Sequence, residues 1–225
     1  MTVDEVIQEL KKFESSHNRE GMKRFGINVD KAFGISVTKL RSIAKKIGKD
    51  HQLAIQLWNS EIHEARILAS MVDDPNLVTK SQMNNWVKDF NSWDLCDQVC
   101  SNLFCKTSYA EDKIFEWSKS KKEFIRRAAF SLIACLAVRD KKRRDEEFLI
   151  FFDLIKKYST DERNFVKKSV NWSLRQIGKR SLFLNTKSIN LTKEILMLNS
   201  NSAKWIAKDA IRELTNPNTI KRIKN

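Results

Sequence analysis

Five segments of the chain carry apolar residues at the same two positions. They begin at His63, Asp94, Phe124, Phe165 and Trp205, and the last three begin 41 and 40 residues apart. Five and nine residues after these starts come Leu68, Val99, Ala129, Val170 and Ala210, then Val72, Leu103, Ile133, Leu174 and Leu214. Residues four apart lie on the same face of an α-helix. Each segment therefore predicts a helix with one buried stripe.

A third position, one residue after each start, is apolar in four segments and holds Glu64 in the first. A period near 40 residues lies in the range of HEAT-type helical repeats, which stack on their neighbours. Five Gly and two Pro in 225 residues favour helices joined by short loops over hairpins. The sequence predicts an all-α, HEAT-like helical-repeat solenoid. Residues 1–225 are expected to form a single domain, with a basic C-terminal tail at about 216–225.

The neighbouring face of each predicted helix is mostly cationic. Three and seven residues after the starts come Arg66, Asp97, Arg127, Lys168 and Lys208, then Ser70, Ser101, Ser131, Trp172 and Arg212. Stacked repeats would align these positions into one basic concave face. Trp93, Asp97 and Trp172 depart from this pattern. Each Trp has a structural alternative, which is to fill a gap between repeats, but two Trp and one Asp on a cationic face favour a functional site.

The charge balance favours a polyanionic partner. The chain has 42 Lys and Arg against 28 Asp and Glu, a net charge of +14 and a pI near 9.7. Nucleic acid is the simplest partner for such a chain, although a soluble protein can be basic without one. No apolar run approaches membrane-spanning length, so no membrane association is expected. The four Cys require no oxidising compartment. We expect a cytoplasmic, nucleoid-associated protein with reduced thiols.

Two other motifs fit a metal site poorly. Cys96, Cys100 and Cys105 lack the C-x-x-C spacing of structural zinc sites, and buried thiols are expected instead. His63 begins a segment like a zincin helix, but Ile67 stands where the second His would be. We expect His63 to cap a helix or lie at an interface. Neither a metal nor a cofactor is predicted.

Three segments together resemble the AlkD-type DNA alkylation repair family, which is built of HEAT-like repeats. The segments are FNSWDLCDQVCSNLF, FIRRAAFSLIACLA and RNFVKKSVNWSLRQIGKR. The resemblance extends from about Gly21 to the end of the repeats. It matches the family's W-D-x-x-D signature, its DNA-contacting Arg and its second aromatic, the last in a W-x-L-R segment ending at Arg175. The matched site residues are Trp93, Asp94, Asp97, Arg127 and Trp172.

The resemblance implies a DNA glycosylase that excises N3- and N7-alkylated purines from duplex DNA. Such bases are positively charged and leave readily, so the enzyme need only stabilise the oxocarbenium-like sugar that forms. Asp97 would supply the negative charge and orient the attacking water. Trp93 and Trp172 would pack against the deoxyribose, and Arg127 would hold the adjacent phosphate. Base flipping, which most base-modifying enzymes use, is not implied.

Five further cations are expected to contact the DNA backbone. They are Arg66, Lys168, Arg175, Lys208 and Arg212. One alternative function is a non-catalytic HEAT-like protein that binds damaged or branched DNA, since the resemblance extends to such paralogues. Another is a HEAT-like scaffold for acidic proteins, which predicts no DNA affinity and gives Asp97 no role. The site residues favour the glycosylase, which we expect to act as a monomer.

Overall fold

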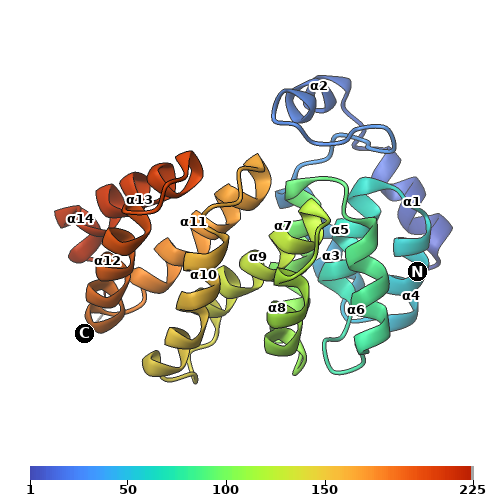
Figure 1. Ribbon diagram of the computed structural model, residues 1–225. Coiled ribbons are helices and arrows are strands. Elements are labelled where there is room, and N and C mark those ends of the chain that lie inside the picture. The colour runs from blue at the N-terminus through green and yellow to red at the C-terminus, as the bar shows by residue number, and fades with distance from the viewer. Residues whose placement is uncertain (224–225) are drawn as a thin grey trace. The chain divides into compact units, whose positions relative to one another are not determined.

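The computed structural model describes residues 1–223, which form helices joined by turns and contain no β-strand (Figure 1). The all-α prediction is confirmed. Internal packing divides the chain into two compact units, Met1–Ala110 and Glu111–Asn225. The single domain expected for the whole chain stays a prediction, and each unit is described by itself. Residues 224–225, the end of the expected basic tail, lie outside the described part.

The first unit consists of short helices, and five of them begin at a hydroxyl or carboxylate cap. Thr2, Ser15, Ser36, Asp50 and Thr79 each accept a backbone N–H from the first turn of the helix that follows. The helices are α1 (Val3–Lys11), α2 (Ser16–Arg24), α3 (Val37–Ile47), α4 (His51–Asn59), α5 (His63–Val72), α6 (Lys80–Trp86), η1 (Val87–Asp89), α7 (Trp93–Asn102) and η2 (Phe104–Lys106).

The second unit has longer helices. They are α8 (Ala110–Ser118), which begins at the last residue of the first unit, α9 (Glu123–Arg139), η3 (Asp145–Phe151), α10 (Phe152–Tyr158), α11 (Asn164–Gly178), α12 (Leu182–Leu196), α13 (Asn201–Leu214) and α14 (Pro217–Ile220). The short helix α14 and the buried side chain of Ile223 occupy part of the segment expected to be a tail.

The five segments of the repeat frame correspond to α5, α7, α9, α11 and α13. All ten residues of the predicted stripe have no exposed surface, from Leu68 and Val72 on α5 to Ala210 and Leu214 on α13. Burying apolar surface is the main favourable term in folding. The two-position frame read from the sequence is therefore confirmed as the core of each repeat.

Helices that occupy the same place in successive repeats pack directly on one another. In the first unit α5 packs against both α3 and α7, and in the second unit α11 packs against both α9 and α13. Gly178 permits the close approach of α11 and α13, because a Cβ there would lie 2.7 Å from Leu214 Cδ2. Each unit thus has the stacking that a helical-repeat fold requires.

Glu64, the polar exception in the frame, is buried with 1% of its surface exposed. Its carboxylate accepts hydrogen bonds from the N–H groups of Phe33, Gly34 and Ile35 at 2.8, 2.6 and 3.1 Å. A buried charge is tolerated when its hydrogen bonds are satisfied. Glu64 therefore holds residues 33–35, which precede α3, against α5 by hydrogen bonds.

A buried ion pair joins α5 to α7. His63 Nε2 lies 2.8 Å from Asp94 Oδ2. Burial alone would lower the pKa of His63, but the hydrogen bond and charge of Asp94 raise that pKa above its ordinary 6.5. Burial alone would raise the pKa of Asp94, but the hydrogen bond and charge of His63 lower it below its ordinary 3.8. His63 and Asp94 are therefore both charged between pH 3.8 and pH 6.5. The interfacial position expected for His63 is confirmed.

Replacing Glu64 by Leu, which restores the apolar pattern, is expected to destabilise the protein. The change leaves three backbone N–H groups buried without their acceptor, which costs about 3–5 kcal/mol in the free energy of unfolding. Urea denaturation measures this loss. Glu194→Leu removes an exposed carboxylate and should stay near wild type. Equal effects of the two changes would contradict the structural role of Glu64.

The His63–Asp94 pair predicts a pH dependence of stability. Because the folded pKa of His63 is raised, its stabilisation is complete below pH 6.5 and is lost as the pH rises through the higher folded value. The difference in unfolding free energy between wild type and His63→Gln should therefore shrink as the pH is raised from 6.5 towards 9. His17→Gln, a change on exposed α2, serves as control. A difference that stays constant over this range would contradict the charged pair.

Candidate functional site

Helix α7 carries the Trp and Asp that depart from the cationic pattern. Its core face buries Leu95 and Val99, and this fixes which side of the helix the remaining residues occupy. Trp93 and Asp97, one turn apart, are both partly exposed. An aromatic ring and a carboxylate thus lie on one face of α7, as the sequence predicts.

The indole of Trp93 is held in place by its own hydrogen bond. Its Nε1 donates to the backbone oxygen of Phe25 at 2.9 Å, which ties α7 to the end of α2. The ring borders an apolar cavity of about 470 Å³. The other residues around this cavity are His17, Asn18, Gly21, Met22, Phe25, Ile27, Gly34, Ile35 and Ser36. Because its N–H already donates to Phe25, Trp93 can contact a ligand with its ring but not by hydrogen bonding.

The two carboxylates of the W-D-x-x-D segment have different surroundings. Asp94 is turned inward to His63 and is ionised by that contact. Asp97 lies three residues further along and is partly exposed. Asp94 therefore has a structural contact, and the catalytic role expected for Asp97 stays a prediction. The sequence assigned the catalytic role to Asp97 alone but did not predict the partner of Asp94, because His63 lies one repeat earlier.

Arg66, the cation of the first unit in the repeat frame, is engaged within the protein. Its Nη2 lies 3.3 Å from Asp89 Oδ2, its Nε donates to the backbone oxygen of Trp58, and its guanidinium lies over the Trp58 ring. These contacts compensate its charge. Contact between Arg66 and DNA stays a prediction.

In the second unit Arg127 is buried, with 5% of its surface exposed. Its Nη1 donates to the backbone oxygen of Phe165 at 2.7 Å and so links α9 to α11. Trp172 is partly exposed on α11. The structure thus gives Arg127 a repeat-joining contact, and its role in holding phosphate stays a prediction.

The remaining predicted cations fall into two groups. Arg175 pairs with Glu213 and Asp209, and Arg212 pairs with Asp209. Lys168 and Lys208 are exposed and make no hydrogen bond or ion pair with any described residue. The two Lys are therefore the members of the predicted set with charge available to a partner. Sequence reasoning missed Asp209 and Glu213, although their places on α13 follow from the same frame.

Cys96, Cys100, Cys105 and Cys135 are buried free thiols, as expected. Within residues 1–223 no group of three or more His, Cys, Asp or Glu side chains is placed to hold a metal ion. None of the helices in that range combines the length and the hydropathy needed to cross a membrane.

Comparison with known proteins places these features in a family. A search of the curated proteins finds no match. One solved structure, described as a new family of proteins related to the HEAT-like repeat DNA glycosylases with affinity for branched DNA structures, is similar with a TM-score of 0.78. Its sequence is 21% identical, and the match covers 94% of this chain and 95% of that chain, which shows the HEAT-like repeat fold. The family model for DNA alkylation repair enzymes matches residues 6–214, and the chain therefore belongs to the DNA alkylation repair enzyme family.

Proposed function

We propose that this protein is a DNA glycosylase that excises N3- and N7-alkylated purines from duplex DNA. The observation that carries the proposal is the arrangement on α7. Trp93 and Asp97 share a partly exposed face, while the neighbouring Asp94 is committed to His63. Membership of the DNA alkylation repair enzyme family supports the substrate class.

The chemistry needs a negative charge more than it needs an acid. An N3- or N7-alkylated purine already carries positive charge, so its departure requires no protonation. As the bond to C1′ breaks, positive charge develops on the sugar, and a carboxylate fixed beforehand stabilises it without reorganisation. We assign this role, together with orienting the attacking water, to Asp97.

The aromatic residues are assigned a separate part of the chemistry. Trp93 would present its ring to the deoxyribose, since the bond to Phe25 occupies its N–H and sets its orientation. An electron-rich ring face also favours a nearby cation. Trp172, partly exposed on α11, is the second aromatic in the proposal. Neither role requires a pocket that encloses an extruded base.

A second candidate is a protein that binds branched or damaged DNA without excising bases. The description of the similar structure, which has affinity for branched DNA, favours it. This candidate shares the basic charge and the repeat fold but gives Asp97 no catalytic role. Measurement of base release separates the two.

The exposed lysines predict how DNA is bound. Lys168→Ala and Lys208→Ala should each weaken binding to all duplex sequences alike, because contacts with the backbone carry no base information. Each lost phosphate contact should reduce the slope of log K against log salt by about 0.9. Fluorescence anisotropy over a salt series measures both quantities. Lys193→Ala on α12 is the control, and an equal loss for that variant would contradict the proposed DNA-contacting face.

Asp97→Asn predicts a loss of catalysis without a loss of binding. The change keeps size and hydrogen bonding but removes the charge, so the single-turnover release of 7-methylguanine should slow roughly 10²–10³-fold. DNA binding should hold or improve, because an anion is removed from a surface that meets phosphates. Ser101→Ala, one turn further along α7, should have a much smaller effect.

The outcomes distinguish the candidates. Release of 7-methylguanine by Asp97→Asn at the wild-type rate would show that the carboxylate is structural. A wild-type protein that binds DNA well but releases no base would establish the second candidate. If Asp97→Asn unfolds at the same midpoint urea concentration as the wild type, the variant is folded and its loss of activity is not a loss of structure.

A further inference from the structure

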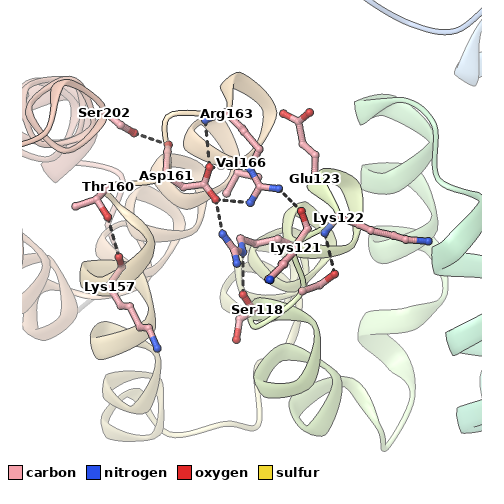
Figure 2. Close-up of polar contacts among 12 residues, drawn as sticks. Ser118, Lys121, Lys122, Glu123, Lys157, Thr160, Asp161, Arg163, Val166 and Ser202 are labelled. Atoms are coloured by element: carbon pink, nitrogen blue, oxygen red, sulfur yellow. Dashed lines mark hydrogen bonds and ion pairs between the residues drawn. The ribbon is translucent and has the colours of Figure 1, made fainter.

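A cationic pocket of about 440 Å³ lies in the second unit, where two turns between helices meet (Figure 2). One turn joins α8 to α9 and the other joins α10 to α11. We call it the turn pocket. The residues that define it here are Lys121, Arg126, Lys157, Thr160, Asp161 and Arg163. None of these residues belongs to the cationic positions of the repeat frame.

The base of the turn pocket is an ordered cluster of two guanidinium groups around one carboxylate. Arg126 Nη1 lies 2.7 Å from Asp161 Oδ2, and Arg163 Nε lies 2.9 Å from Asp161 Oδ1. Arg163 Nη1 also donates to the backbone oxygen of Lys121 at 2.6 Å, which links the two turns. Burial alone would raise the pKa of Asp161, but the hydrogen bonds from Arg163 and Arg126 lower it below its ordinary value. The carboxylate is therefore ionised and already occupied by both Arg residues.

The nearby carboxylates outside the turn pocket are engaged elsewhere. Glu123 accepts the backbone N–H of Phe165, and Glu162 accepts from Ser200 and Ser202. Four cations thus line a pocket that contains one carboxylate, Asp161. These donors are neutral, so Glu123 and Glu162 keep their charge, and the four cations still outnumber the three carboxylates.

The excess charge resides on groups that are free to bind. Lys121 and Lys157 have exposed side chains whose amino groups make no hydrogen bond or ion pair with a described residue. Lys157 Nζ contacts only a ring, 5.4 Å from the centroid of Tyr158. Arg126 uses Nε on the backbone oxygen of Ser118 and Nη1 on Asp161, which leaves Nη2 without a partner in residues 1–223. Two exposed ammonium groups beside a guanidinium donor held by Asp161 suit an anion with several acceptor oxygens.

We propose that the turn pocket binds one phosphate group of the DNA backbone, with Lys121, Lys157 and the free nitrogen of Arg126 as donors. The inference rests on the proposed function for its choice of DNA as the source of the phosphate. The Arg126–Asp161–Arg163 cluster fixes the Arg126 side chain before binding, so binding orders few further side chains. The contact carries no base information and adds affinity for any sequence.

The test compares two double variants with the same loss of charge. Lys121→Ala with Lys157→Ala empties the turn pocket of its free ammonium groups, whereas Lys187→Ala with Lys193→Ala removes two exposed lysines from α12 of the same unit. The first should weaken duplex binding about fivefold to tenfold at 0.1 M salt and reduce the salt slope by about 0.9, as expected for one phosphate. The second should stay near wild type. Lys121→Arg with Lys157→Arg should restore binding, and urea denaturation should show unchanged stability for all three.

Inorganic phosphate and an acidic peptide, poly-glutamate, serve as further probes. Calorimetry that detects phosphate binding abolished by the pocket variant, with duplex affinity unchanged, would assign the pocket to free phosphate and overturn the inference. Poly-glutamate affinity lost in the pocket variant, again with duplex affinity unchanged, would assign it to an acidic protein. If the pocket variant and the wild type have equal duplex affinity and equal salt slope, the proposal that the turn pocket binds a DNA phosphate is also overturned.

Base release separates this inference from the proposed function. At saturating protein the pocket variant should release 7-methylguanine at the wild-type single-turnover rate. A slower rate with unchanged affinity would overturn the assignment as a binding site. A wild-type protein that binds DNA without releasing base would remove the glycosylase proposal and leave the pocket comparison intact. A wild-type protein that binds no DNA would remove both.

Discussion

The fold of each unit depends on stacking equivalent helices one repeat apart with their apolar stripes buried. Apolar packing has no preferred direction, so it does not by itself fix how far one helix is shifted along the next. Polar contacts with a defined geometry set this register. His63 bonds to Asp94, Arg127 to the backbone of Phe165 and Arg175 to Glu213, each joining neighbouring helices of the frame. A helix that slipped by one turn would keep apolar contacts but would leave these buried or partly buried groups unpaired, which is costly. The polar contacts therefore select one arrangement among several that bury similar apolar surface.

Cations that are paired within the protein are less available to bind a ligand. Arg66 and Arg212 of the predicted cationic face, together with Arg175 on α11, are each paired with a carboxylate. Arg175 uses its charge to join α11 to α13, whereas Arg212 pairs with Asp209 within α13. The available charge lies instead on exposed lysines such as Lys168 and Lys208, whose long side chains reach into solvent. Binding by such groups favours contact with a backbone of regular charge over recognition of a base sequence.

The sequence predicted the core because each repeat carries its buried residues at the same two positions, four residues apart. Leu68 and its nine counterparts are apolar in every repeat, and a single pattern finds them. It did not predict the partners of the cations, because a pairing such as Arg212 with Asp209 depends on rotamers that residue type does not set. The turn pocket was also missed, since its residues lie mainly in turns, which share no pattern between repeats. The face of α7 was predicted correctly, because Trp93 and Asp97 follow from helical spacing alone.

The separation of Asp94 from Asp97 is the step where structure adds most to the functional argument. The repeat frame singles out Asp97, and the W-D-x-x-D resemblance adds Asp94 as a second carboxylate three residues before it. The buried contact with His63 removes Asp94 from consideration, because a carboxylate already neutralised by an imidazolium has little field left for a substrate. Asp97 lies on the face that stays partly open to solvent. A carboxylate there opposes the binding of phosphates, and the chemistry of a departing cationic base gives a physical reason for its presence in a basic protein.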